Sequence, residues 1–398
     1  MTPMRTGWTT LALALLITLG FGSPSVPEPI PGTLPAAEAA AGWLRLFDGE
    51  TIAGWSGPAK VQEGSLLLGD ETNQVQVATR AAFGTFELTA EYRLEGGAGT
   101  FTVTHGGSKS VVSEAGDTSW QSFEFNQPEG SPADVITIVT QPGTRLALRR
   151  VHLRPLGLKP LFNGKDLTGW KEAKTARSRS KFSVTEEGEL RIQDGPGDLQ
   201  SEEQWADFVL QLDIYSNGHA LNSGVFARCL PGEFWSGYEA QIRNEWATEL
   251  RLHDGTELLG SLRERDDGKL ALKLCTVEQG RVKLGSQTRE LEKDQVAETR
   301  ARRDLPIDFG TGGIYFHAPA RRVVANDREW FTMTFAIRGD HLSVWVNGYL
   351  TAEWTDARPV QRSPRQGKKL TAGPISLQGH DPTTDLRFRH IRIAGLGE

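Results

Sequence analysis

The strongest constraint on the fold is that one segment opens two parts of the chain. It reads Leu46-Phe-Asp-Gly-Glu-Thr-Ile-Ala-Gly-Trp55 first and Leu161-Phe-Asn-Gly-Lys-Asp-Leu-Thr-Gly-Trp170 later. Two closing segments also match, at 146–153 and 386–393. Repeats that agree in order at both ends are typical of duplicated domains. We therefore predict two homologous domains, residues 43–156 and 158–396, within a length of 398 residues that suits more than one domain.

Apolar residues alternate with polar ones along most segments of both copies. Phe86-Glu-Leu-Thr-Ala-Glu-Tyr92 and Phe208-Val-Leu-Gln-Leu-Asp-Ile214 are corresponding examples, and Gly-centred turns separate such runs. This period of two is typical of half-buried strands, and a helical period of 3.6 is almost absent. The sequence predicts an all-β fold of two tandem antiparallel β-sandwiches, in the jelly-roll manner.

The second copy is longer, and part of the excess lies at residues 249–303. Three Gly-centred turn signals separate short strands there: His253-Asp-Gly-Thr256, Asp266-Asp-Gly-Lys269 and Glu278-Gln-Gly-Arg281. We predict a small β-rich, barrel-like insertion whose role the sequence leaves open. Its charged tail, Ser286 to Asp304, is typical of a short solvated helix.

The first 41 residues are typical of a signal peptide followed by a linker. A basic start precedes an apolar run from Leu11 to Phe21 that is too short to span a bilayer, and small residues around Ala37 suit cleavage. We expect export to the periplasm or the cell exterior, without stable membrane insertion after cleavage. An uncleaved anchor is the alternative. Export also permits a disulfide between Cys229 and Cys275, which we do not favour because they lie in different segments.

The charge balance argues against nucleic acid as a partner. The chain carries 44 basic and 50 acidic residues, a net charge of −6, with no broad basic face. It also lacks a Gly-rich phosphate loop, a Cys-x-x-Cys pair and His pairs at metal-ligand spacing. We therefore expect no cofactor and no metal site. The oligomeric state stays open.

Seven further blocks in the second copy identify a relationship. They are Asn222-Ser-Gly-Val-Phe226, Gly237-Tyr-Glu-Ala-Gln-Ile-Arg243, Phe309-Gly-Thr-Gly-Gly-Ile-Tyr315, Glu329-Trp330, Val346-Asn-Gly348, Ile375-Ser-Leu-Gln-Gly-His-Asp381 and Phe388-Arg-His-Ile391. With its opening segment, the second copy resembles the bacterial 3-keto-disaccharide hydrolase domain family. The resemblance implies a concanavalin A-like sandwich that acts on an oligosaccharide or 3-keto-glycoside, by hydrolysis or elimination of the glycosidic bond.

The first copy lacks the Asn-Ser-Gly, Tyr-Glu-x-Gln and Gln-Gly-His-Asp blocks. We therefore predict that residues 43–156 form a degenerate accessory sandwich, used for binding or for packing against the second domain. Two other functions remain open for the whole chain: a non-catalytic carbohydrate-binding sandwich, or a surface interaction protein. Fold alone does not decide between them.

A 3-keto sugar has an acidic proton on C2, so its cleavage needs a base, a donor for the enolate oxygen and a proton source for the leaving group. Period two places Glu239, Gln241 and Arg243 on one strand face, and the same rule adds Asn222 and Arg228 from a second strand. Spacing alone favours a solvated polar face on these strands; the family match at Glu239 and Gln241 reverses that preference and favours a site.

Two loops supply the remaining candidates. His380 and Asp381 share a Gly-rich turn, where a carboxylate can hold an exposed imidazole. Trp235 lies in a loop where it can stack on a sugar. We predict Glu239, His380 and Arg228 as catalytic, and we predict substrate binding by a larger set: Asn222, Gln241, Arg243, Trp235 and Asp381. The basic stretch from Arg358 to Lys369 is expected to be a solvated loop.

Overall fold

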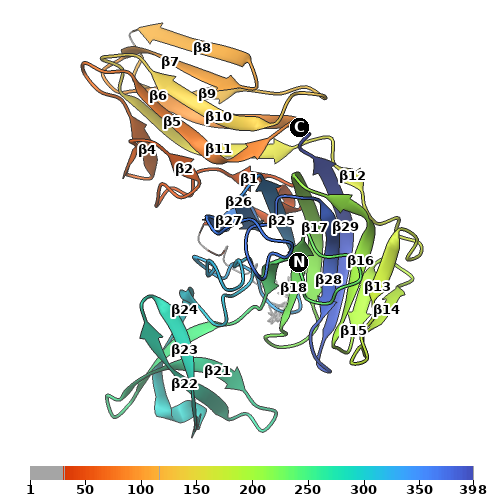
Figure 1. Cartoon of the computed structure of the whole chain (residues 1–398). Helices are drawn as coiled ribbons and strands as arrows, with labels where there is room; N and C mark the ends of the chain where they lie inside the picture. The colour runs from red at the N-terminus through yellow and green to blue at the C-terminus, as the bar shows by residue number, and fades with distance from the viewer. Residues whose placement is uncertain (1–29, 31, 116, 398) are drawn as a thin grey trace, which may run out of the picture.

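The computed structural model describes residue 30, residues 32–115 and residues 117–397, and it confirms the all-β fold class. Figure 1 shows the first sandwich above the second, and a smaller sheet that extends from the second. The apolar run of the predicted signal peptide lies outside the described residues. No described helix is long and apolar enough to cross a membrane.

The first domain consists of two antiparallel sheets. One contains β1 (Leu44–Arg45), β3 (Lys60–Gln62), β4 (Ser65–Leu68), β6 (Phe86–Leu94), β9 (Gln121–Glu124) and β11 (Leu146–Pro155), in the order β3-β4-β11-β6-β9 with β1 paired to β11. The other contains β2 (Trp55–Ser56), β5 (Val75–Phe83), β7 (Ala98–His105), β8 (Ser108–Ala115) and β10 (Asp134–Thr140), in the order β2-β5-β10-β7-β8.

The second domain repeats this design with a larger, eight-stranded sheet in place of the six-stranded one. Its larger sheet contains β12 (Lys159–Pro160), β14 (Lys181–Val184), β15 (Leu190–Gln193), β17 (Phe208–Ser216), β25 (Trp330–Arg338), β26 (His341–Val346), β27 (Tyr349–Thr355) and β29 (Asp385–Gly395), in the order β14-β15-β29-β17-β25-β26-β27 with β12 paired to β29. Its smaller sheet contains β13 (Trp170–Ala173), β16 (Gly197–Trp205), β18 (Ser223–Ala227), β19 (Tyr238–Ile242) and β28 (Gly373–Gly379), in the order β13-β16-β28-β18-β19.

Alternation along the strands builds the core between these two sheets. Leu210 and Leu212 of β17 and Ile375 and Leu377 of β28 are fully buried members of one apolar cluster. Their neighbours in sequence point to the opposite faces, because successive side chains of a strand alternate. The outer face of each sheet of the second domain is therefore available for another purpose.

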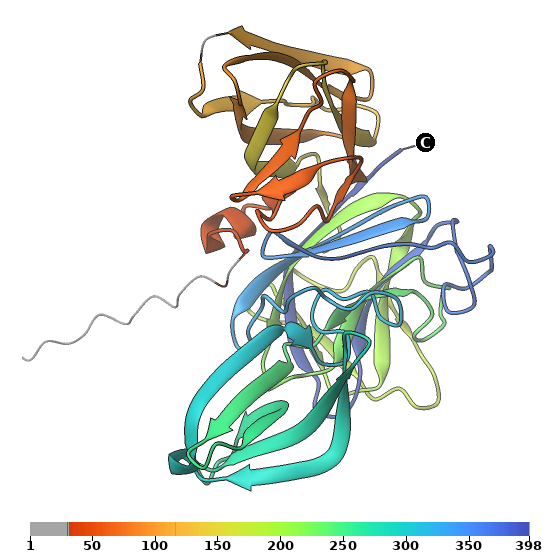
Figure 2. The same ribbon diagram turned by 90° about the vertical axis from the view of Figure 1, so that its left-hand side faces the viewer.

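The insertion forms a separate five-stranded sheet. Its strands are β20 (Trp246–Leu252), β21 (Glu257–Glu264), β22 (Leu270–Glu278), β23 (Arg281–Leu291) and β24 (Val296–Pro306), in the order β23-β22-β21-β20-β24. It thus extends three residues beyond the predicted 249–303 at each end. A small cluster including Leu250 and Leu272 forms its core. Figure 2 shows it at the opposite end of the molecule from the first domain.

The helix predicted at Ser286 to Asp304 is wrong. Only Lys293–Gln295 is helical, as one 3-10 turn (η1), and the residues on both sides are strands. β24 pairs with β20 along its length, so cross-strand hydrogen bonds override the local preference of a charged segment. Cys275 lies in β22 of the same sheet. Neither Cys275 nor the buried Cys229 forms a disulfide.

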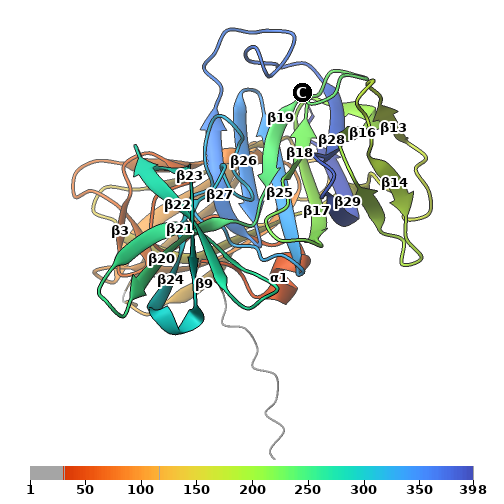
Figure 3. The ribbon, with the colours of Figure 1, turned by 90° about the horizontal axis from the view of Figure 1, so that it is seen from below.

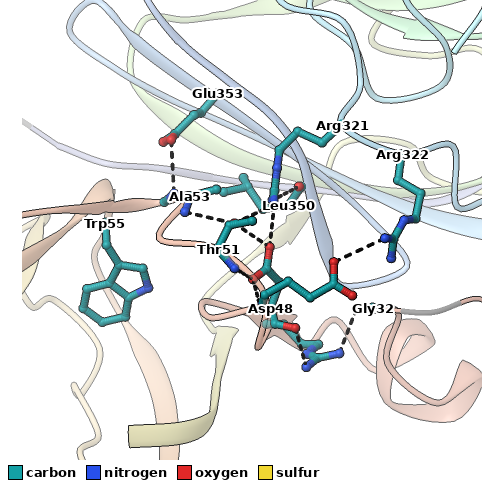
Figure 4. A network of polar contacts seen from close by, with 12 residues as sticks. Gly32, Asp48, Thr51, Ala53, Trp55, Arg321, Arg322, Leu350 and Glu353 are labelled. Atoms are coloured by element: carbon teal, nitrogen blue, oxygen red, sulfur yellow. Dashed lines mark hydrogen bonds and ion pairs between the residues drawn. The ribbon is translucent and has the colours of Figure 1, made fainter. Parts of the chain in front are cut away.

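The first domain packs on the outer face of the larger sheet of the second domain. Trp345 and Ala336 on that face join one apolar cluster with residues of the first domain, and the rings of Phe83 and Trp345 lie 6.1 Å apart. A rim of polar contacts surrounds this apolar contact, and Figure 4 shows one part, in which Arg321 Nη2 donates to Asp48 Oδ2 over 2.6 Å. The first domain therefore packs against the second, on the side away from its smaller sheet.

The last residues of the predicted linker belong to this junction. Ala36–Ala40 form the short helix α1, and Leu34 is buried with its backbone N–H bonded to the carbonyl oxygen of Asn347. The last residues of the segment predicted as signal peptide and linker, 1–41, are therefore packed against the second domain. These residues connect the start of the first domain to β26 and β27.

Candidate active site

Polar side chains cover the outer face of the smaller sheet of the second domain. The pairing of β16, β28, β18 and β19 sets them in rows across the strands, and Figure 3 shows β28, β18 and β19 as neighbours. One row contains Gln200, Ser376, Phe226 and Glu239, and the next contains Asp198, Gln378, Gly224 and Gln241. These polar side chains are buried, so loops cover the face instead of solvent.

Glu239 lies at the centre of this face with two donors on its carboxylate. The indole N–H of Trp235 donates to Glu239 Oε2 over 3.2 Å, and Arg365 Nη2 donates to the same oxygen over 2.9 Å. Burial raises the pKa of Glu239, while the charges of Arg365 and of nearby His380 oppose that rise. Glu239 is therefore a carboxyl group that can hold or release a proton nearer neutral pH than an exposed one.

Asp198 is a second buried carboxyl group that the sequence analysis missed. Its Oδ2 accepts the backbone N–H of Trp235 over 2.7 Å, so one residue bonds both acids. Burial raises the pKa of Asp198 to about 7, and the nearby charge of Glu239 acts in the same direction. Two acids that share one loop and one guanidinium favour a state in which one proton remains on the pair.

His380 stands at the edge of this face, with a side chain that is 43% exposed. Its Nδ1 lies 3.0 Å from Asp381 Oδ2, and its Nε2 lies 3.1 Å from Asn222 Nδ2. An amide NH₂ group can only donate, so Nε2 accepts and Nδ1 carries the proton that is donated to Asp381. Asp381 and Asn222 thus fix the orientation of the imidazole through both of its ring nitrogens.

Several oxygen atoms on this face have no partner, and a small residue leaves room beside them. Asp198 Oδ1, Gln241 Oε1 and Gln378 Oε1 are buried without a hydrogen-bond partner among the described residues. A Cβ atom at Gly224 would lie only 2.8 Å from Glu239 Cγ, so glycine is required for Glu239 to occupy its position. Buried polar atoms normally find partners, and unpaired acceptors are suited to the hydroxyl groups of a ligand.

The prediction that Arg228 joins Glu239 on this face is wrong. β18 ends at Ala227, and Arg228 adopts a left-handed conformation with φ of +50° that turns its side chain away from the row. Its guanidinium is fully buried, donates to the carbonyl oxygens of Ala206, Gly339 and Lys369, and pairs with Asp207 at 2.7 Å. Arg228 is therefore a structural residue that joins loops.

Of the other predicted residues, Gln241 lies beside Glu239, whereas Arg243 lies one residue beyond β19. Gln241 follows Glu239 on the same face and donates to the carbonyl oxygen of Asp308 over 3.0 Å. Arg243 lies at the far end of the strand and pairs with both Glu245 and Asp308. These bonds fix Gln241 and Arg243 and reduce their freedom to reach a ligand, whereas Trp235 remains 39% exposed.

The basic stretch from Arg358 to Lys369 is not a solvated loop. Arg365 reaches over the site, with its guanidinium 4.0 Å from the ring centre of Trp235 and bonded to Glu239. Arg358 pairs with the buried Asp356, and Lys369 is itself buried. Charge spacing alone cannot show the contact of Arg365, because Glu239 lies 126 residues away in the sequence.

A cavity of about 200 Å³ opens beside Glu239. Its lining consists of Gly237, Tyr238, Glu239, Tyr315, Phe316, His317, Arg358, Pro364 and Arg365. His317 stacks on Trp354 with ring centres 3.8 Å apart, and burial together with the charge of Arg358 lowers the pKa of His317 to about 4. His317 is therefore a neutral wall of the cavity. Among the described residues, no three His, Cys, Asp or Glu side chains form a group that could hold a metal ion.

Comparison with known families agrees with the sequence resemblance. The family model described as the 3-keto-alpha-glucoside-1,2-lyase-like domain matches residues 157–394. The match covers more than half of the 398-residue chain and contains every predicted site residue. The match confirms that the second copy resembles the 3-keto-disaccharide hydrolase domain family. No curated protein matches the sequence.

Solved structures of similar shape include two candidate glycosyl hydrolases from Parabacteroides distasonis. The first is 18% identical, with 60% of this chain and 93% of that chain covered and a TM-score of 0.38. The second is 22% identical, with 60% and 100% covered and a TM-score of 0.36. A carbohydrate binding module from Bacillus subtilis is 12% identical, with 56% and 93% covered and a TM-score of 0.31.

Proposed function

The chain belongs to the 3-keto-alpha-glucoside-1,2-lyase-like domain family over residues 157–394, and we propose that this domain cleaves 3-keto-glycosides by removing the proton on C2. The family makes the domain glycosidase-like in the broad sense. One observation carries the finer proposal: two buried acids lie on one face beside unpaired oxygen acceptors, with a carboxylate-bound histidine at its edge.

The reaction requires two proton movements and no change in oxidation state overall. A base takes the C2 proton, the electron pair of that C–H bond forms the C1–C2 double bond, and the C1–O bond breaks. The leaving oxygen takes a proton from an acid. The products are the free leaving group and a 2-hydroxy enone, to which water can add to complete a net hydrolysis.

We assign the role of the base to His380 and the role of the acid to Glu239. In this proposal His380 is the base: its side chain is 43% exposed, and a substrate would displace the amide of Asn222 from Nε2. Glu239 borders the cavity, and burial raises its pKa, so a protonated Glu239 can donate to the leaving oxygen. Asp198 is the second buried acid beside Glu239. It can supply a new proton to Glu239 after Glu239 has donated its own.

In this proposal Arg365 is the donor to the developing enolate oxygen. Arg228 cannot take this role, because its guanidinium is buried among loops away from Glu239. Arg365 is a guanidinium on the outer face, bonded to Glu239. A preorganised cation near developing negative charge is an effective source of transition-state stabilisation. The unpaired oxygens of Asp198, Gln241 and Gln378 would accept hydroxyl groups of the sugar.

Steady-state release of the leaving sugar from a panel of 3-keto-glycosides tests the proposal. We expect turnover by the wild-type chain, and we expect His380→Ala and Glu239→Gln each to lower kcat by about 10²–10⁴-fold, the share usual for general acid–base catalysis. Matched controls are His253→Ala and Glu257→Gln, which change exposed residues of the insertion and should leave kcat unchanged.

Two outcomes contradict the proposal in different ways. A wild-type chain that turns over no 3-keto-glycoside, yet binds oligosaccharides, would show a carbohydrate-binding sandwich. Turnover that survives in both site variants would leave the activity in place but remove His380 and Glu239 from it. Thermal melting of every variant identifies any loss of rate that comes from unfolding.

We also propose that the chain is exported, on the strength of the basic start and the apolar run from Leu11 to Phe21. Fractionation of cells that express the full chain, with mass measurement of the secreted product, tests this. A chain that keeps its first 25 residues and stays inside the cell would contradict it.

A further inference from the structure

Three aromatic side chains, Trp235, Phe309 and Phe316, lie in contact with one another near Glu239, and Phe316 also lines the cavity. Phe316 is 55% exposed and Trp235 is 39% exposed. Their rings lie 6.2 Å apart, and Phe309 lies 6.3 Å from Phe316 on its other side. The three rings form a continuous apolar surface next to Glu239, and we call it the aromatic platform.

The backbone of the platform is unusual. Trp235, Phe309 and Phe316 all adopt the left-handed conformation, with φ of +54°, +70° and +66°. Bulky residues rarely do so, because the Cβ atom crowds the backbone, and each case costs about 1 kcal/mol or more. A polar Asn or a Gly would suit these three positions better. Two of these strained aromatic residues, Trp235 and Phe316, are exposed to water, which points to a role in binding.

The insertion holds one end of the platform. The guanidinium of Arg281, at the turn between β22 and β23, lies 5.5 Å from the ring centre of Phe309. At the other end, Arg365 lies 4.0 Å from the ring centre of Trp235 and also binds Glu239. The platform thus runs without interruption from the insertion to the acid that would protonate the leaving oxygen.

We infer that the aromatic platform binds a ring-shaped leaving group, a sugar or an aryl ring, and that the insertion positions it through Arg281. This inference rests on the proposed function. The cavity that Glu239 and Phe316 share has about 200 Å³, less than typical ligand pockets, and so it admits one ring instead of a longer chain. The apolar face of a pyranose ring is suited to stacking on such side chains.

Leaving-group dependence tests the inference. The substrates are 3-keto-trehalose, which releases glucose, and methyl 3-keto-α-glucoside, which releases methanol. Phe316→Ala should lower kcat/KM on 3-keto-trehalose about tenfold, the effect of losing one aromatic stacking contact. It should leave the methyl glycoside within about twofold. Val111→Ala in β8 of the first domain, an equally exposed apolar side chain at 53%, is the matched control.

Arg281 is a positioning residue, so its variants need a readout that simple instability would not give. Arg281→Ala should selectively lower kcat/KM on 3-keto-trehalose, by a smaller factor than Phe316→Ala does. Arg281→Lys should recover part of this loss. Product inhibition gives a second readout, because glucose should inhibit methyl glycoside turnover by the wild type and inhibit the Phe316→Ala variant about tenfold less.

The results separate the two proposals. A wild-type chain without turnover of either substrate would contradict the proposed function. A wild-type chain that turns over both, combined with Phe316→Ala losing rate equally on both or on neither, would overturn the platform and leave the function standing. A selective loss for the substrate that releases glucose supports the platform.

Discussion

The replacement Gly224→Ala tests whether the position of Glu239 controls activity. The new Cβ would lie 2.8 Å from Glu239 Cγ, 2.9 Å from Phe226 Cε2 and 3.0 Å from Glu239 Oε1. Ordinary carbon contacts begin at about 3.5 Å, so the Glu239 side chain must move by roughly 0.7 Å. Gly224 is outside the left-handed region, and alanine therefore fits its backbone without strain.

The expected cost falls on activity more than on folding. Displacing a catalytic group by close to 1 Å can lower the rate by about 10²-fold, and we expect a fall in kcat of roughly 10- to 100-fold. Overpacking costs about 1–3 kcal/mol of unfolding free energy. The displaced carboxylate would also lose its bonds to Trp235 and Arg365, which are 3.2 and 2.9 Å long.

The assay is kcat on methyl 3-keto-α-glucoside, with urea denaturation measured in parallel. Gly84→Ala in the first domain is the matched control, because its new Cβ would lie 3.4 Å from its nearest neighbour, the carbonyl oxygen of Ser131. This control should keep both rate and stability. A folded Gly224→Ala variant with unchanged kcat would refute the argument that Glu239 must remain where the structure has it.

Three further variants test the structure at other places. Asp198→Asn should change the pH dependence of stability: the folded state raises the pKa of Asp198 from 3.8 to about 7 and so binds its proton more tightly, which makes wild-type stability fall as pH rises between those values. The melting temperature of the variant relative to wild type should therefore rise from pH 4 to pH 7, and a constant difference would contradict this. Arg228→Ala should lower the unfolding free energy by about 3 kcal/mol in urea, because it leaves Asp207 and three carbonyl oxygens without their donor; a change below about 1 kcal/mol would disprove the structural role. Arg321→Ala removes the ion pair to the buried Asp48 at the domain junction, so calorimetry should show the first domain unfolding at a lower temperature than in wild type, and an unchanged profile would argue against the junction.

Local patterns in the sequence were enough for the architecture of the chain and for the face of one strand. The repeated segments and the period of two predicted the all-β fold, which the structure has. The same period put Glu239 and Gln241 on one face of β19, as observed. These features depend on neighbours within a few residues, because alternation of side chains is a property of each extended strand.

The rule that side chains alternate between the two faces failed where it was applied beyond the end of a strand. Arg228 is one residue past β18, and its left-handed backbone breaks the alternation that would have placed it beside Glu239. The charged tail of the insertion failed for a related reason, since pairing of β24 with β20 decides its conformation. Where a strand stops and which strand it pairs with depend on partners outside the local segment.

The electrostatic character of the site is a property of the tertiary structure alone. Asp198 on β16 and Arg365 in a late loop are far from Glu239 in the sequence, and only the order of β16, β28, β18 and β19 together with the loop closure brings the three into one network. The sequence determined which chemical groups the chain owns and which face of each strand carries them. Folding decided which groups meet and how deeply they are buried, and because burial penalises charge, it was folding that raised the pKa values of the two acids.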